Sequence, residues 1–189
     1  MQAGRTPTPT PRMRTWNTPT VLALILGAVG TLGIIELRPQ MSVTPQDPVI
    51  KAEAFSAPFR IDNAGYFSFY VDHVFLYLNE LKNGATSIGD SSSHEPEWNC
   101  FVLDRAESRT IITQFSNGTP TKADIAIAID YRPFRTFPFY FRKYFRFIGA
   151  HGDSWQWLKQ PSSDIQTAAD SRIEDHMRKI PSSRLCKSN

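Results

Sequence analysis

The chain has 189 residues and a formal net charge of +3 at pH 7. Three of its 21 basic residues, Arg5, Arg12 and Arg14, precede the first acidic residue, which leaves 18 basic and 18 acidic residues in the remainder. That balance gives no support for nucleic-acid binding, and no nucleic-acid partner is expected.

Residues 1–18 are rich in Pro, Thr and Arg and contain the repeat TPTPTP at residues 6–11. A segment of this composition cannot build a core. We therefore expect an extended and disordered cytoplasmic tail.

An uncharged apolar run, TVLALILGAVGTLGII, follows at residues 20–35. A helix needs roughly 20 residues to cross a bilayer core of about 30 Å, and residues 19–37 approach that length. We expect a transmembrane signal-anchor helix over residues 19–37. A cleaved signal peptide is the alternative, but the sequence ELRP at residues 36–39 lacks the small residues of a cleavage site.

Positive charge flanks this span mainly on its N-terminal side, because only Arg38 and Lys51 follow it closely. The asymmetry predicts a single-pass membrane protein with a cytoplasmic N-terminus and an extracytoplasmic C-terminal domain. Small residues four positions apart on one helical face would let two helices approach closely and would support a homodimer. Such residues are common in membrane helices generally, and this simpler explanation is the favoured one. This candidate helix-packing face comprises Ala23, Gly27, Gly30 and Thr31.

Residues 38–161 have the size of one compact domain and carry period-two patterns. Residues 124–131 alternate Ile and Tyr with Asp and Ala, as expected for a strand with one buried face. Residues 66–78 predict one long strand, or two strands joined by a kink near Asp72 and His73. Further strands are expected at residues 59–61, 110–113, 141–147 and 155–157, the last two as a terminal hairpin. Residues 82–98 predict an exposed loop.

Short strands without a long helical pattern among them predict an all-β fold, specifically an immunoglobulin-like antiparallel β-sandwich. Beyond the sandwich, residues 162–189 predict a weakly amphipathic helix that ends in a disordered tail. Ile165, Ala169 and Ile173 recur there every fourth residue, after Ser162 and Ser163, which can cap a helix.

The two cysteines, Cys100 and Cys186, would lie in an oxidising compartment if the expected topology holds. A disulfide between them would attach the C-terminal segment to the domain. Their separation in sequence says nothing about their distance in space, so the pairing stays open at this stage.

Residues 131–147, YRPFRTFPFYFRKYFRF, interleave aromatic with basic side chains. Such a segment can bind nucleobases, anionic glycans or acidic headgroups. The alternation favours a simpler interpretation, a hairpin around Pro138 with phenylalanines in the core and basic residues on the solvent face. The candidate interaction surface would comprise Arg132, Arg135, Arg142, Tyr144 and Arg146.

The sequence contains no recognisable nucleophile elbow, phosphate-binding glycine loop or opposed carboxylate pair. No catalytic residue, metal ligand or cofactor is predicted, and the chain is not expected to be an enzyme. His94, Glu95, Glu97 and Cys100 lie close together but lack the paired spacing of zinc sites, so a solvated loop explains them better.

Short motifs at residues 37–39 (LRP), 42–45 (SVTP), 57–66 (APFRIDNAGY), 131–133 (YRP) and 145–147 (FRF) resemble those of a group of uncharacterised bacterial single-pass membrane proteins. These proteins carry a small immunoglobulin-like β-sandwich ectodomain. The resemblance covers residues 37–161. It implies a bacterial inner-membrane anchor and a periplasmic domain, without implying an activity, a ligand or site residues.

The expected function is therefore that of a membrane-anchored extracytoplasmic binding or scaffolding module of the bacterial envelope. Its partners would be the lipid bilayer and other envelope proteins. One alternative is a structural subunit of an envelope complex assembled through the membrane helix. A more remote alternative is a metal-handling or hydrolytic ectodomain.

Overall fold

The computed structural model describes residues 40–50, 53–113, 120–180 and 186. It separates a compact unit, Arg38–Asn189, from Met1–Leu37. The expected tail, the expected membrane span and its packing face of Ala23, Gly27, Gly30 and Thr31 all lie outside the described residues. Among the described residues, no helix is long and apolar enough to span a membrane.

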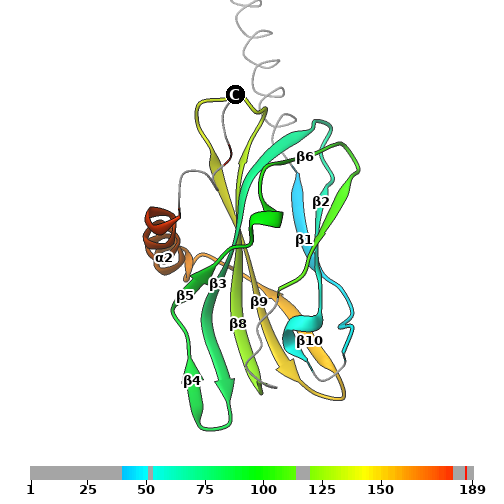
Figure 1. Ribbon diagram of the computed structural model, residues 1–189. Coiled ribbons are helices and arrows are strands. Elements are labelled where there is room, and N and C mark those ends of the chain that lie inside the picture. The colour runs from blue at the N-terminus through cyan, green and yellow to red at the C-terminus, as the bar shows by residue number, and fades with distance from the viewer. Residues whose placement is uncertain (1–39, 51–52, 114–119, 181–185, 187–189) are drawn as a thin grey trace, which may run out of the picture. The chain divides into compact units, whose positions relative to one another are not determined.

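Two antiparallel sheets build the described part of the domain (Figure 1). The small sheet has the order β1-β2-β7, and the large sheet has the order β10-β9-β8-β3-β4, with β5 and β6 also paired to β3. The small sheet comprises β1 (Met41–Pro45), β2 (Phe59–Asn63) and β7 (Ser108–Ile111). The large sheet comprises β3 (Phe69–Asn83), β4 (Thr86–Ile88), β5 (Ser91–Ser93), β6 (Phe101–Leu103), β8 (Lys122–Arg132), β9 (Phe141–His151) and β10 (Trp155–Gln160).

The main core lies between the two sheets, which confirms the predicted antiparallel β-sandwich. Phe59 of the small sheet packs with its ring centroid 5.1 Å from that of Phe147 and 5.6 Å from that of Trp157. The short 3₁₀ helix η1 (Ala54–Ser56) closes this side, because the carbonyl of Ala54 accepts a hydrogen bond from Nε1 of Trp157 at 3.1 Å. Each fully buried large apolar side chain contributes about 1.5–3 kcal/mol.

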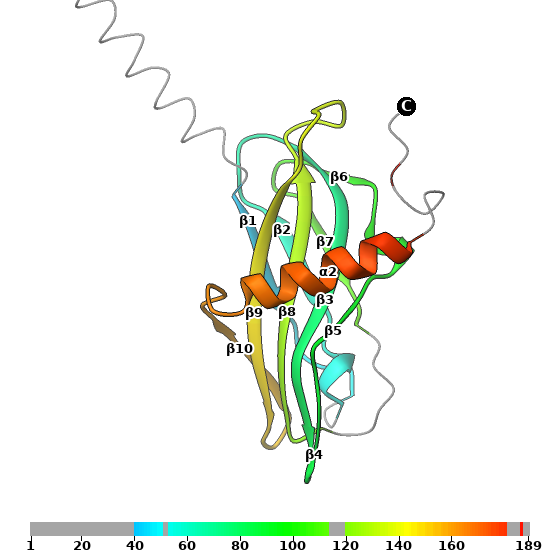
Figure 2. The same ribbon diagram turned by 90° about the vertical axis from the view of Figure 1, so that its left-hand side faces the viewer.

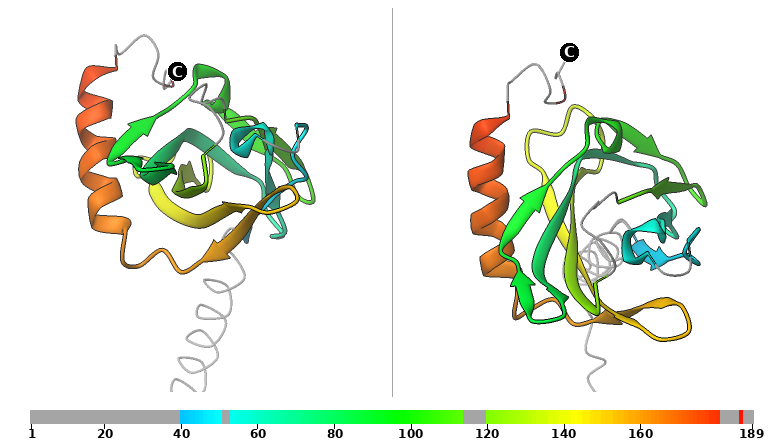
Figure 3. Two further views of the ribbon diagram at one scale, coloured as in Figure 1. Left: turned by 90° about the horizontal axis from the view of Figure 1, so that it is seen from below. Right: turned by 60° about the horizontal axis from the view of Figure 1, so that its bottom comes forward.

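The outer face of the large sheet is covered by helix α2 (Gln166–Lys179), which crosses β9, β8 and β3 (Figures 2 and 3). A second apolar cluster lies between this helix and the sheet. It consists of Phe75, Tyr77, Ala126, Ala128, Ile165, Ala169 and Ile173. The prediction of a single buried face for residues 124–131 was therefore incomplete, since both faces of β8 are buried.

The predicted kink near Asp72 and His73 is present as a bulge within one continuous strand. The register of β3 against β8 shifts between Val71 and His73, which pair with the consecutive residues Tyr131 and Asp130. Asp72 is the extra residue. Bulges of this kind bend a strand and redirect a side chain.

Two segments differ from the expectation. Residues 82–98 contain β4, β5 and the 3₁₀ helix η2 (Pro96–Trp98), because the length of β3 leaves an edge along which short strands pair. Ser162 and Ser163 do not cap α2 with their side chains. Instead the carbonyl of Ser162 accepts a hydrogen bond from the backbone N–H of Ile165 at 3.2 Å.

The close packing of Gly149 in β9 against Trp155 in β10 can be tested by substitution. A Cβ at Gly149 would lie 2.5 Å from Cζ2 of Trp155, whereas at Gly152 its nearest neighbour would be the carbonyl oxygen of Ser154 at 3.9 Å. Gly149→Ala should lower the free energy of unfolding by about 1–3 kcal/mol through overpacking. Gly152→Ala should leave it nearly unchanged. Urea unfolding of both variants measures the difference, and equal effects would contradict this packing.

Candidate interaction surface

Several chain segments meet at the end of the domain where β1 begins, which we term the β1 end. The backbone N–H of Ala64 donates to the carbonyl of Gln40 at 2.8 Å, and Nζ of Lys143 donates to the carbonyl of Met41 at 2.9 Å. These bonds bring the loop before β3 and the start of β9 to the start of β1. The antiparallel pairing of β3 with β8 places the β8–β9 loop at this same end.

Asn63, which is only 1% exposed, organises the loops of the β1 end. Its Nδ2 donates to the carbonyls of Phe67, Leu103 and Asp104 at 2.9, 3.0 and 3.1 Å. Its Oδ1 accepts a hydrogen bond from the N–H of Gly65 at 2.9 Å. One buried amide thereby joins the β2–β3 loop to the β6–β7 turn, and it satisfies backbone groups that would otherwise be costly to bury.

The strongly exposed aromatic side chains of the described residues gather at the β1 end. Their exposed fractions lie between 49% and 69%. Exposed apolar side chains gathered in this way mark interaction sites. This set, which we term the aromatic patch, comprises Tyr66, Phe67, Phe134, Phe139, Tyr140 and Phe141.

The larger part of the patch, on the β8–β9 loop, is held in place by Phe137. The Phe137 ring centroid lies 5.3, 6.2 and 6.1 Å from those of Phe134, Phe139 and Phe141. The guanidinium of Arg132 donates to the carbonyl of Phe137 at 3.1 Å. The exposed rings are thus presented by an ordered loop, so binding would cost little further ordering.

Charges of both signs border the patch. The guanidinium carbon of Arg105 lies 5.2 Å from the ring centroid of Tyr66, and that of Arg135 lies 5.9 Å from the ring centroid of Tyr70. Asp104 and Glu107 lie on the adjacent turn, where the carboxylate of Glu107 accepts the N–H of Asp104 at 2.8 Å. The surface is therefore aromatic with a mixed polar border, and not strongly basic.

The five residues of the interaction surface expected from the sequence lie at two separate places in the structure. Arg135 is exposed beside the patch, and Arg132 pairs there with Asp72. In contrast, Arg142, Tyr144 and Arg146 lie under α2 and do not form a free solvent face. This corrects the expectation, and the physical reason is that acids on both sides neutralise the two arginines. Asp130 and Asp124 belong to β8, Asp170 belongs to α2, and Asp164 lies just before α2.

Arg142 and Arg146 each join two carboxylates. Nε and Nη2 of Arg142 donate to Asp130 at 2.6 and 2.9 Å, and its Nη1 donates to Asp170 of α2 at 2.7 Å. Arg146 likewise binds Asp124 at 2.9 and 2.7 Å and Asp164 at 2.6 Å. Burial alone would lower the pKa of Arg142, but its hydrogen bonds with Asp130 and Asp170 raise it. These pairs attach α2 to the sheet.

Tyr144 completes this polar contact, because its hydroxyl donates to Asp170. Burial raises the pKa of Tyr144 well above its ordinary value, and the hydrogen bond to Asp170 raises it further. The hydroxyl therefore stays protonated and serves as a donor. Its role in the described structure is to position the helix.

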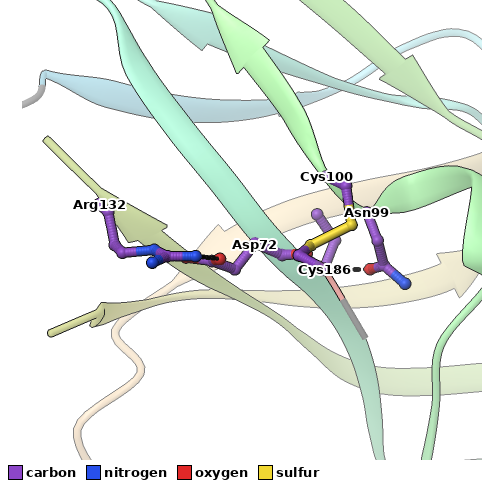
Figure 4. Close-up of a disulfide and its surroundings, with 6 residues drawn as sticks. Asp72, Asn99, Cys100, Arg132 and Cys186 are labelled. Carbon is purple, nitrogen blue, oxygen red and sulfur yellow. Dashed lines mark hydrogen bonds and ion pairs between the residues drawn. A yellow bond between two sulfur atoms is a disulfide. The ribbon is translucent and has the colours of Figure 1, made fainter. Parts of the chain in front are cut away.

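Cys100 and Cys186, whose pairing the sequence left open, form a disulfide. Figure 4 shows the bond beside Asp72, with Arg132 on the other side of that residue. The carbonyl of Asp72 accepts the N–H of Cys100 at 3.2 Å. The bulged residue thus contacts β8 through its side chain and the disulfide-bearing segment through its backbone.

Three histidines pack around the ring of Phe75, namely His73, His94 and His176 of α2. Nδ1 of His94 lies 2.9 Å from Nε2 of His176, so one of the two nitrogens must donate to the other. Burial lowers the pKa of His73, and nearby Asp130 and Asp72 offset this only in part. Burial also lowers the pKa of His176, with a further lowering by Lys179. Neutral imidazoles suit this packing.

The segment with His94, Glu95, Glu97 and Cys100 does not converge on one point. Cys100 is in the disulfide, His94 contacts α2, and the carbonyl of Glu97 accepts a hydrogen bond from Arg109 at 3.0 Å. Within residues 40–50, 53–113, 120–180 and 186, no three His, Cys, Asp or Glu side chains are grouped so that they could hold a metal ion.

The interaction surface expected from the sequence contains none of the six patch residues. The phenylalanines of residues 131–147 were expected in the core, and the aromatic run from residue 66 was expected to form a strand. The β3 strand begins at Phe69. The preceding Asn63-Ala64-Gly65 turn was the available signal, since side chains directly after a turn need not follow the alternation of the strand.

Comparisons of the chain with protein-family models, curated proteins and solved structures found no match. The function is therefore argued from the chain's own residues.

Removal of the guanidinium from Arg142 tests the attachment of α2. The carboxylate of Asp130 is only 2% exposed, so Arg142→Met would leave it buried and uncompensated. We expect the free energy of unfolding to fall by roughly 3–5 kcal/mol. Arg172→Met is the matched control because Arg172 and Asp90 are 46% and 52% exposed, and its effect should be much smaller. Similar losses for both variants would refute the assignment.

The histidines predict a loss of stability in mild acid. The folded-state pKa values of His73 and His176 lie below 6.5, so the unfolded chain takes up protons first as the pH falls. The contribution of these neutral histidines to the free energy of unfolding is therefore complete above pH 6.5. It is lost progressively as the pH falls from 6.5 through the folded-state pKa values. Thermal unfolding at about pH 7.5 and about pH 5.5 should show a lower midpoint in acid.

His176→Gln should reduce this acid-induced drop in the midpoint. His151→Gln is the control, because His151 is exposed at the end of β9 and pairs with Trp155 of β10, and it should leave the drop unchanged. If the unfolding midpoint falls equally in acid with and without His176, the loss of stability does not arise from this histidine.

Proposed function

We propose that this protein is a single-pass, membrane-anchored binding or scaffolding module of the bacterial envelope. Its immunoglobulin-like β-sandwich lies outside the cytoplasm and binds through the aromatic patch at the β1 end. The observation that supports this proposal is the gathering of Tyr66, Phe67, Phe134, Phe139, Tyr140 and Phe141 on adjacent loops of one end. The apolar run at residues 20–35 and the arginines before it support the anchor and its orientation.

A binding role suits the patch better than a catalytic one. The rings of the β8–β9 loop are exposed but fixed by Phe137 and by the hydrogen bond from Arg132, so the loop is prepared for contact. Titratable residues such as His73 and Tyr144 are engaged in packing and in the attachment of α2. An exposed aromatic surface of this kind supports recognition.

The proposal is tested by hydroxyl-radical footprinting of the full chain in intact membranes. Phe139 and Tyr140 are 69% and 60% exposed, whereas Ile88 of β4 is 49% exposed and intrinsically less reactive than an aromatic ring. A free surface would therefore be oxidised faster at Phe139 and Tyr140 than at Ile88. An occupied patch should reverse this order.

Oxidation that follows the exposed fractions would show an unoccupied patch and contradict the proposal. The variant Gly27→Leu addresses the alternative, a structural subunit assembled through the membrane helix. Loss of a crosslinked oligomer in that variant, with unprotected Phe139, would favour assembly through the span.

A further inference from the structure

We propose that the aromatic patch binds the lipid bilayer in which the protein is itself anchored. This inference rests on the proposed function, because it names the partner of the same surface. What carries it is a juxtaposition: the exposed aromatic side chains lie at the same end of the domain as Gln40 and Met41, where the chain enters it.

Connectivity restricts the distance between this end and the membrane. The expected span ends at Leu37, and Gln40 is three residues further along the chain. A chain extends at most about 3.6 Å per residue, so Gln40 can lie no more than about 11 Å from the end of the span. The hydrogen bond from Ala64 to Gln40 then keeps the β2–β3 loop near the same surface.

The side chains of the patch match the chemistry of a bilayer interface. Phenylalanine rings enter the boundary between headgroups and acyl chains, while tyrosines keep their hydroxyl groups in the polar layer. Tyr66 and Tyr140 supply such hydroxyls beside Phe67 and Phe139. Arg105, whose guanidinium carbon lies 5.2 Å from the ring centroid of Tyr66, is long enough to donate to headgroup oxygens beside that ring.

The form of the β8–β9 loop also favours a fluid partner. In Figure 1 the backbone of this loop extends past the start of β1, and Phe134, Phe139 and Tyr140 belong to the loop. A protein partner would need a complementary hollow for Phe134 and Phe139, whereas a bilayer adapts to the shape that enters it. Because Phe137 already orders the loop, little conformational freedom is lost on insertion.

The mixed border charge indicates what kind of lipid binding to expect. Arg105 and Arg135 are opposed by Asp104 and Glu107 on the adjacent turn. Burial of aromatic surface therefore supplies most of the attraction, and anionic headgroups add little. The anchor keeps the patch at high effective concentration near the interface, so weak intrinsic affinity is sufficient.

The test uses photocrosslinking of the full chain in intact membranes. Phe139 is replaced by the photoreactive p-benzoylphenylalanine in one variant, and Ile88 is replaced in the control. Ile88 is also apolar and exposed, but it pairs with Leu81 near the far end of β3. After illumination, intact mass analysis separates phospholipid adducts from protein adducts.

We expect a several-fold higher yield of phospholipid adducts at position 139 than at position 88. The same excess should persist when the protein is reconstituted into purely zwitterionic phosphatidylcholine vesicles. Protein adducts without lipid adducts at position 139 would overturn the inference while leaving a binding role for the patch. Equal lipid yields at the two positions would also overturn it.

The two proposals fail in distinguishable ways. Protection of Phe139 from hydroxyl radicals together with protein adducts would retain the binding function and reject the lipid. Rapid oxidation of Phe139 with no adduct of either kind would reject both.

Discussion

The pairing of β3 with β8 is the interaction on which the rest of the domain depends. It runs from Tyr70 opposite Arg132 to Lys82 opposite Lys122 and is interrupted only by two register shifts. The short strands β4, β5 and β6 pair with the other edge of β3. Helix α2 packs on apolar side chains of its outer face. Because the two strands are buried on both faces, loss of their register would move apolar side chains on two layers at once.

Asp72 shows how an irregularity in this pairing is used. As the extra residue of a bulge, Asp72 does not pair with a residue of β8. Its carbonyl accepts a hydrogen bond from the N–H of Cys100, and its carboxylate accepts one from Arg132. The same guanidinium holds the carbonyl of Phe137 in the β8–β9 loop. A single bulge therefore connects the position of the disulfide with the order of the aromatic patch.

Alternation was sufficient to predict the main strands, because β2, β9 and β10 each bury one face more fully than the other. In β8 the alternation of Ile with Ala and Asp gave the same signal, although both of its faces are buried. It could not reveal that α2 covers the opposite face. Arg142 and Arg146 have the spacing of solvent-facing residues. Their burial is compensated by Asp130 and Asp124 on β8 and by two further acids, Asp170 in α2 and Asp164 just before it. The patch was equally hidden, since Phe67 and Phe139 are brought to one end by strand pairing between distant segments. Local sequence patterns hold no information on such long-range contacts.

The disulfide limits how far α2 can move when it separates from the sheet. The helix is joined to β10 at its N-terminal side, and beyond its C-terminal side the chain is fastened at Cys186 to Cys100. A helix held at both ends cannot diffuse away when its contacts with Phe75 and Tyr77 break. Its separation from the sheet is a unimolecular fluctuation, and its return to the apolar face competes favourably with a bimolecular encounter with another molecule. The covalent bond thus acts as a kinetic safeguard against aggregation, in addition to any effect on equilibrium stability.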